Sequence, residues 1–416
     1  MAAGPAVAPG ASPGQGRLRS IDVLRGCAAL AVVADHAFKH GGYAAIATPW
    51  FLALRAVVNH GVLGVPLFFV ISGFCIHLPW ARRAAAGTPA RVNVREFWLR
   101  RLHRLYPPYF VMLCLSIAAV VTASAIGLPI ATVDRYPEPR STWIAADFLL
   151  HATMLHGFSP TFDQMAGNPP FWTLAREEYL YLLYFAVLTW RGRRGMLFAL
   201  ATVLAIGIGV PWLASVVIPS LPVGPAWQDR LWHPVHMETS AIALWIQWCL
   251  GMAAVEGCYG VIRLPGWCRR IAVAVLWAAA ALFAERHGWT SLTPVLWGLA
   301  FFTLLNRLVE LERAGRWPSA APVGWLRAVG LVSYSIYLVH SPLIGLLNQT
   351  ERFVLGRSSP LLVMPGYHLA TWMLFVLAAV LAGWAFFQVV ERRFLNFPTK
   401  VPLQGDMFFS SHQNTQ

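Results

Sequence analysis

The chain has 416 residues, of which 57% are hydrophobic and 12% are charged, and its net charge is +14. A soluble globular protein carries about 25% charged residues, so this composition excludes a soluble protein and indicates lipid as the main solvent. The positive charge lies in short clusters between apolar stretches, which is typical of membrane topology and argues against nucleic acid as a partner.

Two tails are expected to flank the membrane domain. Residues 1–16 are mainly Ala, Pro and Gly and carry no charged side chain, which predicts a disordered tail without the basic region of a signal peptide. The membrane domain is expected over residues 17–398, and residues 399–416 are expected to form a flexible C-terminal tail. The cysteines and histidines lack the spacing of a zinc site, so no metal is predicted.

Apolar stretches long enough to cross a membrane recur along the chain. A hydrocarbon core about 30 Å thick requires roughly 20 residues per helix. The fold class predicted is therefore an all-α, polytopic transmembrane helix bundle of about ten spans. The predicted spans are residues 20–39, 61–80, 105–129, 171–190, 195–218, 239–260, 271–287, 289–308, 326–348 and 363–390. In the longest expected outer loop, 130–170, the apolar segment 143–156 suggests an interfacial or re-entrant helix.

The basic clusters provide an internal test of this topology. Ten alternating spans place all of them on one side of the membrane, and the expected loops on the other side (40–60, 130–170, 219–238 and 349–362) are poorer in Lys and Arg. Positively charged loops face the cytoplasm, so both termini are predicted to be cytoplasmic. The clusters are Arg17 and Arg19; Arg82 to Arg104; Arg191, Arg193 and Arg194; Arg263, Arg269 and Arg270; Arg307 to Arg327; and Arg392, Arg393 and Lys400.

The first span carries ionisable side chains at membrane depth, where they are costly and are candidates for function. Arg25 and His36 are eleven residues apart, close to three helical turns, so they share one face at a separation of about 16 Å. Asp22 and Asp35 lie in the same span. The alternative is a purely structural role, in which Arg25 pairs with Asp22 and His36 is an interfacial histidine.

The third and fourth spans add further candidates. Glu177 and Glu178 lie near the outer end of the fourth span, at a depth similar to that of His36. A carboxylate facing a histidine would orient it and raise its basicity, as in a catalytic triad. Arg100, Arg101 and Arg104 begin the third span, and guanidinium groups suit phosphate binding. Pairing of a glutamate with Arg176, and simple anchoring by the arginines, remain the alternatives.

Small and polar side chains in two more spans are weaker candidates. Ser72 and Gly73 in the second span would let another helix or a ligand approach closely. Ser335 and His340 lie in the ninth span, within SYSIYLVH, and Tyr181 follows the paired glutamates. Each of these side chains, taken alone, fits helix packing as well as it fits a lining of the site.

Together these segments resemble the membrane-bound acyltransferase family 3, the bacterial O-acyltransferases of glycans, antibiotics and related molecules. The resemblance runs from about Ser20 to Phe394. It is carried in order by IDVLRG with the following Asp35-His36, FFVISGF, RRLHRLYPPY, FWTLAREEYLYLL, SYSIYLVH and VERRFL. The chain departs from the family pattern at Thr173, Arg176, Leu180, Tyr184-Phe185, Ser341 and Arg393, which leaves the acceptor undefined.

The resemblance implies a mechanism. Acyl-CoA, expected to be acetyl-CoA, would enter from the cytoplasm as a co-substrate, with no permanently bound cofactor. Its phosphates would contact Arg100, Arg101 or Arg104, and its pantetheine arm would pass Arg25. His36, flanked by Asp35 and oriented by Glu177, would take the proton of an acceptor hydroxyl. The partners implied are acyl-CoA, membrane lipids and a glycan, glycolipid or other hydroxylated acceptor, and the location implied is the bacterial inner membrane.

Three alternatives stay open at this point. An acyl-enzyme intermediate on Ser72 would replace direct transfer, although the sequence has no GxSxG nucleophile motif. A proton-coupled secondary transporter or exporter would also use buried Arg, His and Glu side chains, but the paired halves common in transporters are not visible. A structural membrane subunit would leave the buried charges without a role.

Overall fold

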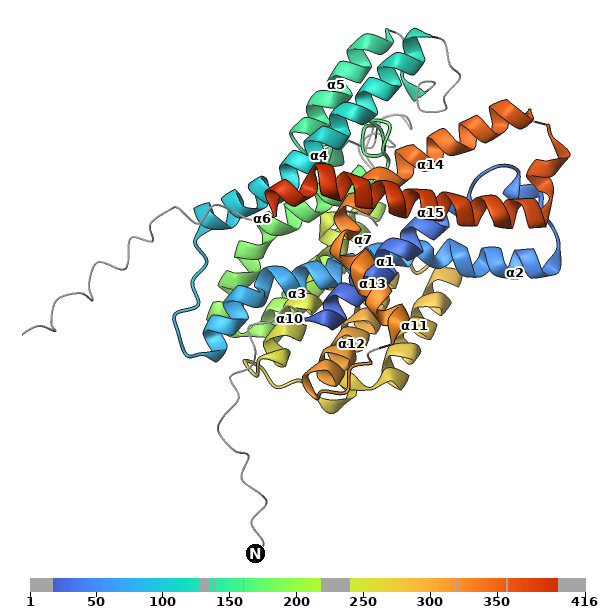
Figure 1. Cartoon of the computed structure of the whole chain (residues 1–416). Helices are drawn as coiled ribbons and strands as arrows, with labels where there is room; N and C mark the ends of the chain where they lie inside the picture. Colours follow the sequence, from blue (N-terminus) through green and yellow to red (C-terminus); the bar gives the residue numbers. More distant parts are fainter. Residues whose placement is uncertain are drawn as a thin grey trace, which may run out of the picture.

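The computed structural model describes residues 18–126, 135–137, 139–159, 161–217, 240–318, 320–356 and 358–395. These residues form α-helices and short 3-10 helices, with no strand among them (Figure 1). The predicted all-helical class is confirmed. The expected tails and the expected loop 219–238 lie outside the described residues.

Each of the ten predicted spans overlaps a described helix. These helices are α1 (Arg19–Phe38), α3 (Gly64–Ala85), α4 (Val94–Ala125), α6 (Phe171–Arg194), α7 (Met196–Val217), α10 (Ala241–Cys258), α11 (Ile271–Arg286), α12 (Thr293–Arg313), the pair α13 (Ala321–Leu331) and α14 (Ser333–Leu355), and α15 (Pro365–Val389). By length and composition, six described helices could cross a membrane, or seven if α13 and α14 form one bent span. The count of ten therefore stays a prediction.

A helix was expected within residues 143–156, and α5 (Arg140–Ala152) overlaps that segment. Two features differ from the predicted spans. The expected outer loop 40–60 contains a helix, α2 (Pro49–Val58). The predicted span 326–348 is broken, because α13 and α14 meet at 76°. At the break Val332 leaves helical geometry (φ −109°, ψ 12°), and the Ser333 hydroxyl donates to the carbonyl of Gly330 at 2.9 Å. That bond caps a carbonyl at the end of α13.

The main core surrounds α10, which packs against α3, α6, α7 and α12. At the contact with α3, a Cβ on Gly73 would lie 1.8 Å from the carbonyl oxygen of Trp248, so the two backbones touch. The expectation that this part of the second span admits a close neighbour is confirmed. Such contacts replace the hydrophobic driving force that helices lack in lipid.

A second close contact joins α1 to α13. A Cβ on Gly330 would lie 1.7 Å from the carbonyl oxygen of Asp22, and a Cβ on Gly26 would lie 2.1 Å from that of Leu326. The α1–α13 contact therefore fixes the helix that carries Arg25 and His36 against the α13–α14 corner. On its other side α1 packs against α14 and α15.

Members of several basic clusters lie at one end of the bundle. Glu312, near the end of α12, accepts hydrogen bonds from the backbone N–H groups of Arg19 and Ser20 at the start of α1. Hydrogen bonds also join three other helix ends to the end of α10. Arg82 of α3 donates to Tyr259, Arg191 of α6 donates to Glu256, and Arg313 of α12 donates to the Cys258 carbonyl. This shared end is the arrangement that the predicted alternation of spans requires. At another edge of the bundle α5 lies beside α4, and both project beyond the other helices (Figure 1).

Candidate active site

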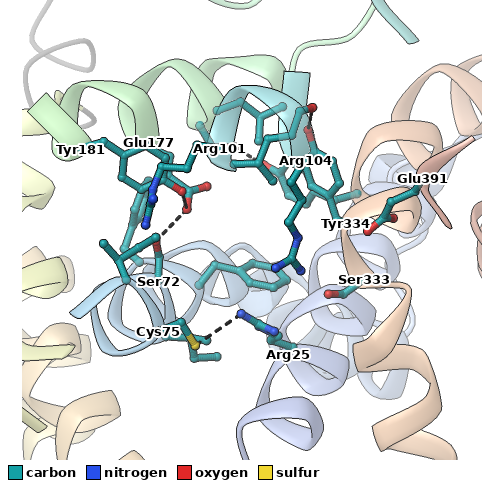
Figure 2. A pocket seen from close by; sticks show the side chains of 18 of the residues that line it. Arg25, Ser72, Cys75, Arg101, Arg104, Glu177, Tyr181, Ser333, Tyr334 and Glu391 are labelled. Atoms are coloured by element: carbon teal, nitrogen blue, oxygen red, sulfur yellow. Dashed lines mark hydrogen bonds between the residues drawn. The ribbon is translucent and has the colours of Figure 1, made fainter. Parts of the chain in front are cut away.

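A cavity of about 400 Å³ lies between α1, α3, α4, α6 and the α13–α14 corner (Figure 2). All four arginines predicted to bind the acyl donor line it, although they come from two different helices. Ser72, Glu177 and Tyr181 line it as well. The predicted members of the cavity wall are thus Arg25, Arg100, Arg101, Arg104, Ser72, Glu177 and Tyr181, and the rest of the lining is largely apolar.

Arg25 and Arg104 define the arginine wall of the cavity. The Arg25 guanidinium donates to the Cys75 sulfur at 3.4 Å, and its Nη1 lies 4.0 Å from a carboxylate oxygen of the buried Asp22. Arg104 extends from α4 toward Arg25, so that two guanidinium groups point into one cavity (Figure 2). Paired guanidinium groups beside apolar side chains suit a phosphate or another compact anion.

Arg100 and Arg101 differ from these two in their surroundings. Arg100 is exposed and pairs with Glu96 one turn earlier in α4. The Arg101 guanidinium lies over the Phe97 ring, 3.4 Å from its centroid, and donates to the Phe97 carbonyl at 2.8 Å. It is also 5.2 Å from the centroid of Tyr181. These contacts fix Arg101 between the arginine wall and the side of the cavity lined by Glu177, which we call the acidic wall.

Glu177 organises the acidic wall. Its carboxylate accepts hydrogen bonds from the Ser72 hydroxyl at 2.6 Å and from the Tyr181 hydroxyl at 2.5 Å (Figure 2). Ser72 in turn accepts from the indole N–H of Trp248 at 3.2 Å. The adjacent Glu178 is not among the lining residues of this cavity. Of the two glutamates, Glu177 is the one that faces the cavity.

His36 lies outside the cavity lining, at the opposite end of α1 from Arg25. Its Nδ1 is 2.9 Å from the Val32 carbonyl, which can only accept, so Nδ1 carries the proton and Nε2 holds a lone pair. Its ring makes an edge contact with the ring of His340, at a centroid distance of 5.1 Å. Within the described residues no hydrogen bond joins His36 to Glu177, so orientation of His36 by Glu177 stays a prediction.

His340 has the same tautomer as His36. Its Nδ1 lies 2.7 Å from the Tyr337 carbonyl, and its Nε2 is buried with no hydrogen-bond partner in the described part of the chain. We call His36 and His340 the histidine pair. Both side chains were candidates from the sequence. Their contact could not be predicted, because they lie on two different helices, α1 and α14.

Asp35 and Ser335 also lie outside the cavity lining. Asp35 is buried, and its Oδ2 lies 2.8 Å from Lys39 Nζ and 3.9 Å from His36 Nδ1. Ser335 donates to Glu391, in the 3-10 helix η8 (Glu391–Phe394), and the Glu391 carboxylate does line the cavity. Burial raises the pKa of Glu391 above its usual value, against the opposing effects of this bond and of Arg104. Glu391 had no assigned role in the sequence analysis, although it lies in VERRFL, one of the segments that carry the family resemblance.

A layer formed by α5 and by residues 154–159 and 161–170 covers the start of α6. Arg176 is buried there and pairs with Asp163 at 3.0 Å, not with a glutamate. His156 stacks on His151 at a centroid distance of 3.7 Å, and its Nε2 lies 3.3 Å from the Phe171 carbonyl. Burial, together with the neighbouring His151, lowers the pKa of His156 to about 2.

The chain is similar in sequence to a family of acyltransferases and to several named proteins. The profile of a family described as an acyltransferase domain matches residues 18–388. The peptidoglycan O-acetyltransferase OatA of Listeria monocytogenes serovar 1/2a is 26% identical over 355 residues, which cover 79% of this chain and 49% of that protein.

Two further relatives match a shorter segment of 134 residues. The putative peptidoglycan O-acetyltransferase YrhL of Bacillus subtilis (strain 168) is 30% identical over 30% of this chain and 19% of that protein. The O-acetyltransferase OatA of Staphylococcus aureus (strain NCTC 8325) is 31% identical over 32% of this chain and 21% of that protein. The chain thus spans about half of the first of these relatives and about a fifth of the other two. No solved structure matches it significantly.

Proposed function

The chain belongs to acyltransferase family 3, and from this premise we propose that it is an integral-membrane O-acetyltransferase with a glycan acceptor. The observation that carries the proposal is the cavity in which Arg25 and Arg104 meet an acidic wall made by Glu177. The names of the relatives, which refer to O-acetylation and in two cases to peptidoglycan, support a glycan hydroxyl as acceptor. They give no support to the transporter alternative.

Acetyl-CoA is the proposed donor. Basic side chains at one end of the bundle support a cytoplasmic face at that end under the positive-inside rule, and the proposed location is a bacterial inner membrane with both termini inside. Arg104 and Arg25 would bind the phosphate groups and guide the pantetheine arm toward the acidic wall, with Arg100 and Arg101 contributing positive charge at the entrance.

His36 is the proposed general base. Its Nε2 lone pair would take the proton of the acceptor hydroxyl while that oxygen attacks the thioester carbonyl. The C–S bond then breaks, and the CoA thiolate leaves and takes the proton from the His36 imidazolium. The carboxylate of Glu177 would favour the transient imidazolium by its charge, and Asp35 would do the same from the opposite side.

The direct test follows acetyl transfer in membranes. Radiolabelled acetyl-CoA is supplied to envelope fractions that contain wild-type protein or His36→Ala at equal abundance. We expect label in a glycan fraction with the wild type and none above background with the variant. Equal labelling by both proteins would remove His36 from the mechanism, and absence of label with both would reject the donor or the acceptor class.

A covalent route through Ser72 has one observation in its favour. The Ser72 hydroxyl donates to the Glu177 carboxylate at 2.6 Å, the arrangement of a nucleophile beside a base. Ser72→Ala separates the two routes. Direct transfer predicts that the variant keeps most of its activity, whereas the covalent route predicts its loss and an acetylated wild-type protein that can be trapped without acceptor.

A further inference from the structure

The cavity and the histidine pair are separate, and Tyr337 contacts both of them. Tyr337 of α14 lines the cavity, while neither His36 nor His340 does. The Tyr337 ring lies 5.4 Å from the His340 ring, which in turn contacts His36. On the cavity side, Tyr337 makes an edge contact with Phe68, another lining residue, at 6.0 Å. The order in space is therefore cavity, Tyr337, His340 and His36.

A hydrogen-bonded chain holds Tyr337 in this position. The Thr173 hydroxyl donates its one proton to the Pro170 carbonyl at 3.0 Å. The Tyr337 hydroxyl lies 2.8 Å from Thr173 Oγ1 and 3.4 Å from the same Pro170 carbonyl, so it can donate to either oxygen. Pro170 precedes α6, which carries Glu177, so this latch ties the tyrosine of α14 to the helix of the acidic wall.

The proposed reaction requires the thioester and His36 to meet, and the observed arrangement keeps them apart. We propose that Tyr337 is a positioning residue that closes the acyl-donor cavity against the histidine pair, with Thr173 as its latch. This inference rests on the proposed acetyl transfer from acetyl-CoA. The tyrosine must turn away before the acceptor hydroxyl, the thioester and His36 can come into contact.

The closed position has a chemical purpose. Water that reached the thioester beside His36 would attack its carbonyl, and acetyl-CoA and water would become acetate and CoA thiol. A closed Tyr337 keeps the donor from that side until an acceptor is bound, in the manner of lids that exclude water from a reactive intermediate.

The experiment compares variants of the latch in the full-length membrane protein. Thr173→Val and Tyr337→Phe each remove the hydrogen bond and keep the shape, and Thr173→Ser keeps the hydroxyl as the matched control. We expect both latch variants to raise acceptor-independent hydrolysis of acetyl-CoA by roughly 2- to 12-fold, the change in open population that one net hydrogen bond holds back. Thr173→Ser should stay within about twofold of the wild type. The double variant should match Tyr337→Phe, because that change alone already removes the Tyr337 bonds to Thr173 and to Pro170.

Cys75 provides a second measurement that does not depend on activity, because this free cysteine lines the cavity. A membrane-impermeant maleimide applied from the side opposite the basic clusters should leave Cys75 unmodified in the wild type and in Thr173→Ser. It should modify Cys75 in Tyr337→Ala, where the ring is gone, and more slowly in Thr173→Val. A Cys75→Ser variant identifies the signal.

The outcomes separate this inference from the proposed function. Unchanged hydrolysis in both latch variants, or modification of Cys75 from that side in the wild type, would overturn the role of Tyr337 while acetyl transfer stands. A wild-type protein that transfers no acetyl group from acetyl-CoA would instead overturn the proposed function.

Discussion

The two ends of α1 lie in different surroundings. Arg25 lines a cavity of about 400 Å³ in which charged side chains from α1, α4 and α6 converge. His36 lies outside it, against a second imidazole, with its Nδ1 tied to the carbonyl of its own helix. The two ends of one helix therefore differ in surroundings. In the proposed mechanism, donor binding would take place at the Arg25 end and proton transfer at the His36 end, and movement of Tyr337 would join the two.

The largest expected effect tests the histidine side of this comparison. His36→Ala removes the proposed base, and general-base catalysis contributes about 10²–10⁴-fold to rate. We expect kcat to fall by that amount while the KM for acetyl-CoA stays within about threefold, because His36 does not line the cavity. Steady-state kinetics on purified protein provides the measurement. A rise in KM as large as the fall in kcat would show that donor binding and proton transfer share one site.

The next effect tests the cavity side. Arg25→Gln removes a guanidinium that points into the cavity, and a hydrogen bond to a charged group contributes about 1.5–3 kcal/mol. We expect the KM for acetyl-CoA to rise by roughly 10- to 100-fold with little change in kcat. Arg100→Gln is the matched control, because Arg100 is exposed and already paired with Glu96, and it should cost no more than about fivefold. Equal effects of the two variants would contradict the assignment of Arg25 to the donor.

A pH-dependent effect extends the comparison to the layer that covers the start of α6. His156 has a folded pKa of about 2 against an ordinary value of 6.5, so below pH 6.5 the opened layer binds a proton that the folded layer does not. Its stability should fall as the pH drops from 7 to 5, by up to about 2 kcal/mol. Hydrogen exchange of residues 140–159, corrected for intrinsic rates, measures this change. His156→Gln should remove the pH dependence, and its persistence would assign the titration to another group.

The smallest expected effect distinguishes two roles of Glu177. If its charge favours the imidazolium of His36 across Tyr337, Glu177→Gln should lower kcat by about 3- to 10-fold, as expected for loss of one charge at moderate distance. Glu178→Gln changes the neighbouring carboxylate, which does not line the cavity, and should stay within about twofold. An effect of Glu177→Gln on KM alone would limit Glu177 to shaping the cavity.

The sequence predicted the parts of this site that depend on a single helix. Stretches of apolar residues located the helices, and helical spacing placed Arg25 and His36 at opposite ends of α1. The break at Val332 was missed because GLVSYS is apolar enough to read as a continuous span and contains no proline. The helix α2 was missed because the pattern of charged clusters assigned residues 40–60 to a loop.

Contacts between helices were beyond what the sequence could predict. Glu177 was expected to face His36, because both lie at a similar depth. In the structure its hydrogen-bond partners are Ser72 and Tyr181, which the sequence offered only as separate polar side chains. The position of Tyr337 between the cavity and His340 depends on the rotation of α14 about its own axis, which no pattern within one helix reveals.

The α1–α13 contact also bears on how such a protein can change during evolution. With the Asp22 carbonyl 1.7 Å from where a side chain on Gly330 would begin, no larger residue can be accepted at one position without a simultaneous backbone shift on the partner helix. The α1–α13 contact beside the cavity therefore tolerates few single substitutions at these glycines. In the layer of α5 and residues 154–159 and 161–170, by contrast, side-chain hydrogen bonds hold the backbone and can be replaced one at a time.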